Sequence, residues 1–361
     1  MSTANHRYCV IMCGGIGSRF WPYSRQSLPK QFIDFFGTGR SLLQMTYDRI
    51  LPLVAKENIL VVTNADYAPV VREQLPDLAD SQLLLEPARR NTAPCIAWAA
   101  RHVQALDPEA SMIVTPSDHL ITNERVFQES VRHGFEFVES HDSLLTLGIR
   151  PTRPETGYGY IQIGKEVEPG ILKVKTFTEK PDLELAKVFV DSGEFFWNAG
   201  IFLWSVKSIS EAFENLAPDL SREFDKGDGV FGTPGETDFI NEHFPACPNI
   251  SVDFAIMEKA SNVYVECVDF GWSDLGTWSA LYDNSPKTRE GNVTQKCSVM
   301  TYNSRGNIFA VRDEKLVVVS GLENYIVADA GDVLLICPMK EEQDIKRMVN
   351  DVKERFDDKY L

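Results

Sequence analysis

Long apolar segments are missing from this sequence. No run approaches the roughly 20 apolar residues that a membrane-spanning helix requires. The first apolar run, residues 8–13, stops at a pair of glycines and is too short for the hydrophobic part of a signal peptide. We therefore expect a cytoplasmic protein with neither a targeting segment nor a membrane partner.

Cysteine is sparse and shows no paired pattern. The seven cysteines are odd in number, and none of them forms a C-x-x-C pair. This scatter argues against a disulfide framework and against structural zinc. It is typical of reduced thiols in the cytosol.

Basic residues are the minority among the charged ones. The 36 Lys and Arg against 52 Asp and Glu give a formal net charge of −16 over 361 residues. A surface this acidic repels a phosphate backbone, which excludes nucleic acid as a general partner. The first 40 residues differ, because they hold five Lys or Arg and one Asp, or +4. That window is either statistical scatter or a local anion site, and charge alone does not choose.

What is present is the composition of a folded α/β protein. Hydrophobic residues make up 43% and charged residues 24%, and the length suggests roughly two domains. In the N-terminal half, short apolar runs alternate with longer mixed segments, as in βαβ units. The runs predict strands at 8–13, 59–63, 83–85, 112–115 and 144–149. Ser41 and Gln44 fit a capping box that opens a helix, and 93–103 predicts another.

The pattern changes twice further along the chain. Residues 155–285 look irregular, with helices near 183–192, 206–215 and 252–259, and we interpret them as the substrate-facing side of the same domain. Short β-rich runs follow Pro286 at 299–302, 308–311, 316–319, 325–328 and 333–336, which predicts a small β-solenoid or sheet. The predicted domains are therefore 1–286 and 287–361.

The tail after Glu341 predicts an amphipathic helix. Its apolar face would carry Ile345, Met348, Val349, Val352 and Phe356. The partner of that face is either the β-rich module or a second subunit. A homodimer is expected if the solenoid edge or this helix needs a partner.

The strongest chemical signal follows the first predicted strand. Gly14, Gly15 and Gly17 allow backbone N–H groups to approach phosphate oxygens, and Arg19 and Lys30 add cationic groups. A Rossmann glycine fingerprint fails at Phe20, and no Walker A sequence is present. A structural turn is the plainer interpretation of the glycines alone. The nearby cations favour an anion site.

Two carboxylates are candidates for a metal site. Asp118 follows the predicted strand 112–115, where ligands collect in an open α/β sheet. Asp274 is the natural second ligand, with Asp269 as a competitor. Magnesium typically uses one or two carboxylates together with waters and substrate phosphates. The alternative role for Asp118 is the N-cap of the following helix.

Three further segments suit a small polar ligand. Gly157 stands among aromatic residues, Glu179 and Lys180 pair a hydroxyl acceptor with a phosphate cation, and Asn198 offers an amide to hydroxyls. Each segment is equally compatible with a turn or an exposed salt bridge.

Taken together, the motifs resemble the bacterial mannose-1-phosphate guanylyltransferase family of sugar-nucleotidyltransferases. The matching segments appear in the family's order: 14–32, 86–94, 116–119, 155–161, 179–181, 197–202, 251–259 and 271–278. The resemblance implies an α/β fold with a Rossmann-like, mixed and mostly parallel sheet flanked by helices. A small left-handed β-helix-like module and a terminal helix would follow. Many relatives continue into a phosphomannose isomerase domain, for which this chain is too short, so we expect no isomerase activity.

The resemblance also implies a reaction and residue roles. GTP and α-D-mannose 1-phosphate would give GDP-mannose and diphosphate, with Mg²⁺ bound by Asp118 and Asp274. Arg19 and the backbone amides of Gly14, Gly15 and Gly17 would bind the triphosphate. Lys30 would bind the phosphates near the transferred phosphorus. Lys180 would bind the sugar phosphate. The mannose would be bound by Gly157, Glu179 and Asn198. The nucleotide would be bound by Glu86 and Asn91.

Two alternatives remain open from the sequence. The first is a sugar-nucleotidyltransferase that uses glucose 1-phosphate or a different nucleoside triphosphate, which the glycine segment fits equally well. The second is a non-catalytic sugar-nucleotide sensor on the same fold. That alternative predicts missing carboxylates or cations, yet Arg19, Lys30, Asp118 and Asp274 are all present.

Overall fold

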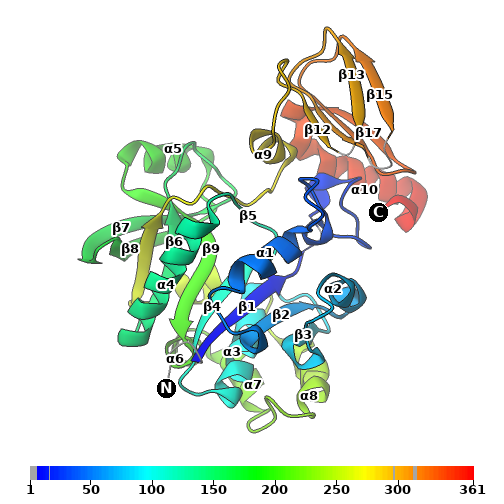
Figure 1. The fold of residues 1–361 in the computed structure, drawn as a ribbon. Helices are drawn as coiled ribbons and strands as arrows, with labels where there is room; N and C mark the ends of the chain where they lie inside the picture. Colours follow the sequence, from blue (N-terminus) through cyan, green and yellow to red (C-terminus); the bar gives the residue numbers. More distant parts are fainter. Residues whose placement is uncertain (1–5, 16, 296, 312–314) are drawn as a thin grey trace. The chain divides into compact units, whose positions relative to one another are not determined.

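The computed structural model describes residues 6–15, 17–295, 297–311 and 315–361 (Figure 1). The chain forms two compact units, each built from separate stretches of sequence. The first comprises Met1–Gly14, Tyr47–Ser117 and Ile121–Trp272, and the second Gly15–Thr46, Asp118–Leu120 and Ser273–Leu361. The glycine-rich segment thus groups with the C-terminal residues, while a boundary between residues 286 and 287 stays a prediction. Among the described residues, no helix combines the length and apolar character needed to cross a membrane.

The first unit is built on a nine-stranded mixed sheet. Its order is β3 (Leu83–Glu86), β2 (Ile59–Asn64), β1 (Arg7–Cys13), β4 (Ser111–Pro116), β9 (Phe195–Ser205), β6 (Leu144–Ile149), β10 (Val263–Val268), β8 (Ile171–Glu179) and β7 (Gly159–Glu168). Pairings around β1 and between β6 and β10 are parallel, whereas β8 and β9 run antiparallel to their neighbours. Only β8 and β9 of the nine described strands run against the common direction, so the sheet is mixed and mostly parallel in strand direction, as predicted.

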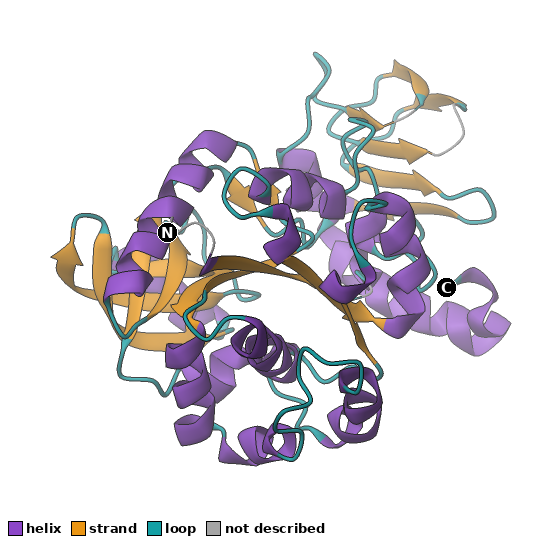
Figure 2. Cartoon of the chain, turned by 60° about the horizontal axis from the view of Figure 1, so that its bottom comes forward, coloured by secondary structure: helices purple, strands orange, loops and turns teal. Residues whose placement is uncertain are grey.

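Helices cover both faces of this sheet (Figure 2). Trp204 of β9 lies in the apolar cluster that contains residues of α3 (Thr92–Leu106) and α6 (Val206–Leu216). Its neighbour Leu203 lies against Gly134 of α4 (Glu124–Ser140). Because successive side chains of a strand point to opposite faces, α4 covers the face opposite α3 and α6.

The shorter helices complete the first unit. They are α2 (Ala68–Gln74), α5 (Leu183–Ser192), α7 (Pro218–Asp225) and α8 (Glu236–His243). Helix α5 has the predicted bounds, and α6 extends one residue beyond them. The helix expected near 252–259 is instead a short π-helical turn, Asp253–Met257.

The prediction of an irregular stretch over 155–285 was wrong. This stretch supplies four strands of the sheet, β7 to β10. Two features hide them in the sequence. Asn198 and Gly200 interrupt the apolar pattern of β9, and the register between β6 and β9 shifts between Thr146 and Gly148. The five strands predicted in the N-terminal half are confirmed to within two residues.

The second unit contains a β-helix-like module. Strands β12 (Val293–Gln295), β14 (Ile308–Val311) and β16 (Tyr325–Asp329) pair in parallel, and β17 (Leu334–Pro338) closes that sheet antiparallel. Strands β13 (Ser298–Tyr302) and β15 (Leu316–Ser320) form a second parallel pair. Buried asparagines join successive coils, because Asn292 Oδ1 accepts from both the backbone and the side-chain amide of Asn307, each at 3.0 Å. The predicted solenoid is confirmed.

Other elements of the second unit surround the apolar core of this module. Helix α10 (Ile345–Phe356) places Ile345 in the core, with Met348, Val349 and Val352 packed against it. The tail helix therefore covers its own module, the first of the two predicted partners. Phe356 was predicted on the same face but is 52% exposed. Helix α9 (Trp278–Asp283) also belongs to this unit. Helix α1 (Leu42–Ile50) begins in this unit and continues into the first, and the Ser41–Gln44 capping box before it is confirmed.

Candidate active site

The glycine-rich segment turns sharply after β1. Gly15 and Gly17 have φ of +92° and +65°, a region that favours glycine. A Cβ on Gly17 would lie 2.6 Å from Lys30 Cβ, so a larger residue does not fit. Ile16 lies outside the described residues. The next residues form a 3-10 turn, Ser18–Phe20, which carries Arg19.

A cavity of about 290 Å³ in the second unit opens beside this turn. Its lining brings together the four residues predicted to be catalytic, which come from three separate stretches of the chain. The lining residues are Gly17, Ser18, Arg19, Phe20, Lys30, Asp118, Asp274, Gly276 and Lys346. Cations and a glycine turn, which suit a phosphate ligand, thus meet carboxylates, which suit a metal ion, at one place.

Lys30 is buried at the base of this cavity, with an exposed fraction of 5%. Its Nζ lies 2.9 Å from Asp118 Oδ2 and donates to the carbonyl oxygens of Asp274 at 2.7 Å and Leu275 at 3.1 Å. The three hydrogens of the ammonium group therefore all have protein acceptors. Lys30 therefore holds in place both segments that carry the carboxylates. To contact a phosphate, its ammonium group would have to give up a hydrogen bond to one of these three acceptors.

Asp118 is held in its ionised form. Burial alone would raise the pKa of this carboxyl, but the charges of Lys30 and His119 and the hydrogen bond from Lys30 outweigh it, so the pKa lies below its usual value. Asp118 does not cap the following helix, because Asn123 caps α4 by accepting from Val126 N at 3.3 Å. The alternative role considered for Asp118 is thereby removed.

Asp274 occupies a tight, strained loop. Its Oδ1 accepts from Gly276 N at 2.9 Å, and a Cβ on Gly276 would lie 2.6 Å from the other carboxylate oxygen. The next residue, Leu275, has a φ of +46° while its side chain is fully buried. Backbone strain of this kind clusters at functional sites, where packing holds it in place. Asp269, the competing carboxylate, is exposed and does not line this cavity.

The donor set fits a hard divalent cation. Asp118 and Asp274 supply carboxylate oxygens to the same cavity, and magnesium needs one or two carboxylates when phosphates complete its shell. Over the described ranges, no cluster of three or more His, Cys, Asp or Glu forms an all-protein metal cage. This arrangement suits a metal that arrives with a phosphate ligand.

Two cations of the cavity are available to an anion. Arg19 Nε is buried and has no hydrogen-bond partner in the part of the chain that the structure describes. Lys346, on the first turn of α10, is exposed and lines the same cavity. Sequence reasoning missed Lys346, because no local pattern links a lysine of the tail helix to the glycine turn.

A second group of predicted residues gathers in the first unit around Asn198. Its Oδ1 accepts from Gly200 N at 3.0 Å and lies 2.9 Å from the Thr146 hydroxyl, while its Nδ2 donates to Asp253 Oδ1 at 2.9 Å. Burial, and then the negative charge of Glu179, raise the pKa of Asp253 to about 6. Asp253 was also missed as an individual residue, although it lies in the matching segment 251–259.

Glu179 and Lys180 lie beside this group. They form an ion pair, and the Glu179 side chain is only 7% exposed. A Cβ on Gly159 would lie 2.5 Å from Glu179 Oε2 and 3.4 Å from Asn198 Cβ, so Gly159 lies against both of these residues. Gly157, the predicted glycine, donates instead to Glu155 Oε1 at 3.2 Å.

Glu86 and Asn91 lie at the other end of the same unit's sheet. Glu86 ends β3, is 9% exposed and has an Oε1 with no partner among the described residues. Burial raises its pKa to about 7, although a hydrogen bond with Cys95 and the charge of Arg89 lower it. Asn91 accepts from Thr92 N at 2.8 Å and so caps α3.

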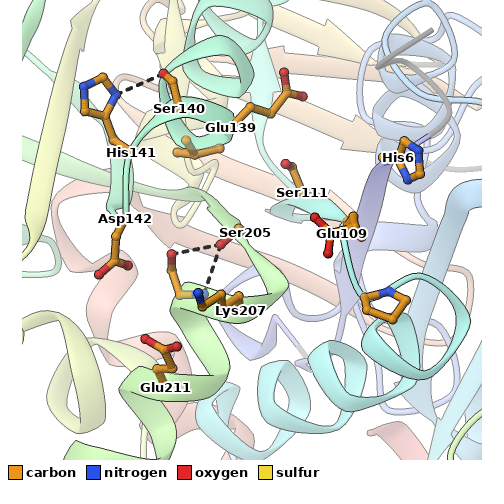
Figure 3. Close-up of a pocket in the computed structure, with 14 residues that line it drawn as sticks. His6, Glu109, Ser111, Glu139, Ser140, His141, Asp142, Ser205, Lys207 and Glu211 are labelled. Carbon is orange, nitrogen blue, oxygen red and sulfur yellow. Dashed lines mark hydrogen bonds between the residues drawn. The ribbon is translucent and has the colours of Figure 1, made fainter. Parts of the chain in front are cut away.

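A larger hollow of about 640 Å³ in the first unit is a poor candidate for the same ligand (Figure 3). It lies where β1 and β4 begin, whereas ligands of open α/β sheets bind beyond the strands' carboxyl ends. Its lining is rich in carboxylates, from Glu109, Glu139, Asp142 and Glu211. Such a surface repels phosphate.

The fold and the cavity define a class of enzyme, and comparison with known proteins agrees. The chain belongs to the nucleotidyl transferase family, whose model matches residues 8–291. Among its relatives, the mannose-1-phosphate guanylyltransferase of Escherichia coli is 39% identical over 96% of this chain and 74% of its own length. The mannose-1-phosphate guanylyltransferase of Klebsiella pneumoniae is 38% identical over 97% of this chain and 75% of its own.

A solved structure matches the whole architecture. The Thermus thermophilus protein described as mannose-1-phosphate geranyltransferase superposes with a TM-score of 0.87 at 29% sequence identity. The match covers 96% of this chain and 99% of the other. The α/β core and the β-rich module are therefore shared with that protein.

Proposed function

We propose that this protein transfers GMP from GTP to α-D-mannose 1-phosphate, producing GDP-mannose and diphosphate. One observation carries the assignment to nucleotidyl transfer: Arg19, Lys30, Asp118 and Asp274 line a single cavity beside the glycine turn. The choice of mannose and guanine rests on the relatives, which are 38–39% identical and are named for these substrates.

The reaction needs no covalent enzyme intermediate. A phosphate oxygen of mannose 1-phosphate attacks the α-phosphorus of GTP and forms a new P–O bond. The bond from that phosphorus to the oxygen shared with the β-phosphate breaks, and diphosphate leaves with the electron pair. Because the nucleophile is already an anion, catalysis consists of positioning and of neutralising charge.

The second unit's residues serve the triphosphate. The amides of the glycine turn and the guanidinium of Arg19 bind phosphate oxygens, and Lys30 fixes the segments that carry Asp118 and Asp274. These two carboxylates would hold Mg²⁺, which when bound offsets negative charge on the reacting phosphates. The lowered pKa of Asp118 keeps this ligand ionised at neutral pH.

The first unit's residues serve the sugar and the base. With its Oδ1 occupied by Gly200 N–H and one Nδ2 hydrogen given to Asp253, Asn198 presents its remaining N–H to a sugar hydroxyl. Glu179 accepts from hydroxyls, and Lys180, which is 60% exposed, meets the sugar phosphate. Glu86 and Asn91 are assigned to the nucleotide, with the unpartnered Glu86 oxygen accepting from the donor edge of guanine.

A substrate matrix tests the proposal. Diphosphate release is measured for each pairing of mannose 1-phosphate or glucose 1-phosphate with GTP, ATP, UTP or dTTP, with Mg²⁺ present or chelated. GTP with mannose 1-phosphate should be the best pair and should require the metal. Robust use of glucose 1-phosphate with UTP or dTTP would establish the alternative nucleotidyltransferase. Nucleotide binding without release from any pair would establish a sensor.

We infer a cytoplasmic location and small-molecule partners from the same chemistry. All seven cysteines are free thiols, in keeping with a reducing compartment. A homodimer remains a proposal. Sedimentation of the chain with and without residues 341–361 measures whether the tail helix contributes to assembly.

A further inference from the structure

The tail helix delivers a cation to the cavity of the glycine turn. We propose that Lys346 binds the phosphate groups of the nucleoside triphosphate, as a third cation beside Arg19 and Lys30. The inference rests on the proposed function for the identity of the ligand. It adds a residue that lies more than 300 positions after the glycine turn in the sequence.

The backbone that carries Lys346 is firmly anchored. Its neighbour Ile345 is fully buried in the core that also contains Phe20 and Trp278. One turn earlier, Glu342 Oε2 accepts from Ser279 N at 2.8 Å. Helix α10 packs directly against the Ser18–Phe20 turn, which carries Arg19. The flexible stem of Lys346 therefore starts from a fixed point beside the cavity.

The other charged residues of the cavity do not by themselves give it a net positive charge, so Lys346 can contribute to binding an anion. Lys30 donates to three protein acceptors, one of which is the carboxylate of Asp118. The lining holds Arg19, Lys30 and Lys346 against Asp118 and Asp274, or three positive charges minus two negative ones. Without Lys346 the formal charge falls from +1 to zero, which weakens the attraction for a polyanion.

Lys346 also differs from two of the three other cations of its own helix, Arg347 and Lys353. Arg347 lies 3.8 Å from Asp344, and Lys353 lies 3.2 Å from Asp358. Over the described residues, no ion pair within 4.0 Å engages Lys346. Its ammonium group is thus available to a ligand, and Arg347 is a matched control with the same charge and the same helix.

The ligand that this cavity suits is the triphosphate. The cavity contains the glycine turn and Arg19, whereas Asn198, Glu179 and Lys180 belong to the first unit. Loss of Lys346 should therefore act on the nucleotide and not on the sugar phosphate.

Steady-state kinetics of the full chain test this assignment. Lys346→Ala should raise the KM for GTP about tenfold, the order expected for losing one charge-assisted hydrogen bond. The KM for mannose 1-phosphate should stay within about twofold, as expected for a group outside the sugar site. Lys346→Arg should restore most of the GTP affinity, and Arg347→Ala should match the wild type.

Direct binding separates this proposal from the proposed function. Calorimetric titration of GTP and of inorganic diphosphate into wild type, Lys346→Ala and Arg347→Ala requires no turnover. Weaker binding confined to Lys346→Ala supports the phosphate contact even if the substrate matrix contradicts guanylyl transfer. Equal binding by all three folded proteins, checked by thermal unfolding, or an equal loss in Arg347→Ala would overturn it.

Discussion

The two groups of candidate site residues, one in each unit, are held in place by different physical means. In the second unit, the site consists of tight turns, positive-φ residues and opposed charges, with Lys30 holding Asp118 and the Asp274 loop in place. In the first unit, Asn198 sits within β9 and is oriented by neutral and singly charged hydrogen-bond partners. Polyphosphate needs charge and close backbone approach, whereas a sugar needs oriented hydroxyl partners. The contrast predicts that mutations at the cavity of the glycine turn and mutations around Asn198 separate by substrate.

The largest effect should follow from removing a carboxylate of the second unit. Asp118→Asn and Asp274→Asn should each lower Mg²⁺-dependent kcat by about 10²-fold or more, the scale of losing one electrostatic contributor to a transition state. Turnover measured over a range of Mg²⁺ concentrations checks this. Near-wild-type metal-dependent rates in either variant would remove that residue from the metal site.

Lys30→Ala should combine loss of activity with loss of stability. The substitution leaves Asp118 without its partner and frees the carbonyl of Asp274, so kcat/KM should fall for both substrates. Because the lysine is 5% exposed, we expect a destabilisation of about 3 kcal/mol, typical of breaking a buried pair. Denaturant unfolding and kinetics at a temperature where the variant is folded measure the two effects. A change in stability alone would make Lys30 purely structural.

Asp253→Ala should affect the sugar selectively. Loss of the acceptor for Asn198 Nδ2 releases the amide, so the KM for mannose 1-phosphate should rise about tenfold with little change in that for GTP. Asp253→Asn keeps an acceptor oxygen and should show a smaller rise. In the wild type this KM should fall as pH rises through about 6, where the Asp253 carboxyl ionises and accepts more strongly. Equal changes in both KM values would contradict the separation by substrate.

Glu86→Gln should give the smallest change, in base selectivity and in pH dependence. The variant should prefer GTP over ITP less than the wild type does. The folded protein holds the Glu86 proton up to about pH 7, while the unfolded chain releases it near 4.5. Between these values the folded state binds more protons, so stability falls as pH rises, and Gln should flatten that slope. Urea unfolding of the wild type and of Glu86→Gln at pH 4.5 and 7 measures how the free energy of unfolding changes with pH. If that change is the same in both proteins, Glu86 is not its cause.

Apolar runs and apolar spacing in the sequence predicted much of the fold, because apolar residues mark the side chains that are buried. The run 144–149 is apolar throughout and is the strand β6, and the spacing of Ile345, Met348 and Val349 identified the packed face of α10. Strands β7 and β8 escaped prediction because most of their residues are half-buried or exposed, so no continuous apolar run marks them. The polar Asn198 in β9 further breaks the apolar pattern, since it serves a hydrogen-bond network.

The candidate site residues likewise divide into those that the sequence predicted and those that it did not. Gly17, Arg19 and Lys30 were predicted together because they are close in sequence. Asp118 was predicted because it follows an expected strand, with Asp274 as its natural second ligand, and the resemblance to a family implied the same pair. Asp253 and Lys346 were not predicted, since each acquires its neighbours only through tertiary packing. The Cβ clash at Gly159 likewise requires the position of Glu179 across the β7–β8 pairing.

The shared core of the second unit has a consequence for how the protein is made. Phe20 and Trp21 leave the ribosome early, yet the residues that bury them, such as Ile345, are synthesised near the end of this chain. Domains usually fold as they emerge, but this turn must wait with its aromatic side chains uncovered. The cavity of the glycine turn is therefore among the last parts of the molecule to form, and nascent chains should depend on a chaperone at this segment rather than at the early strands of the sheet.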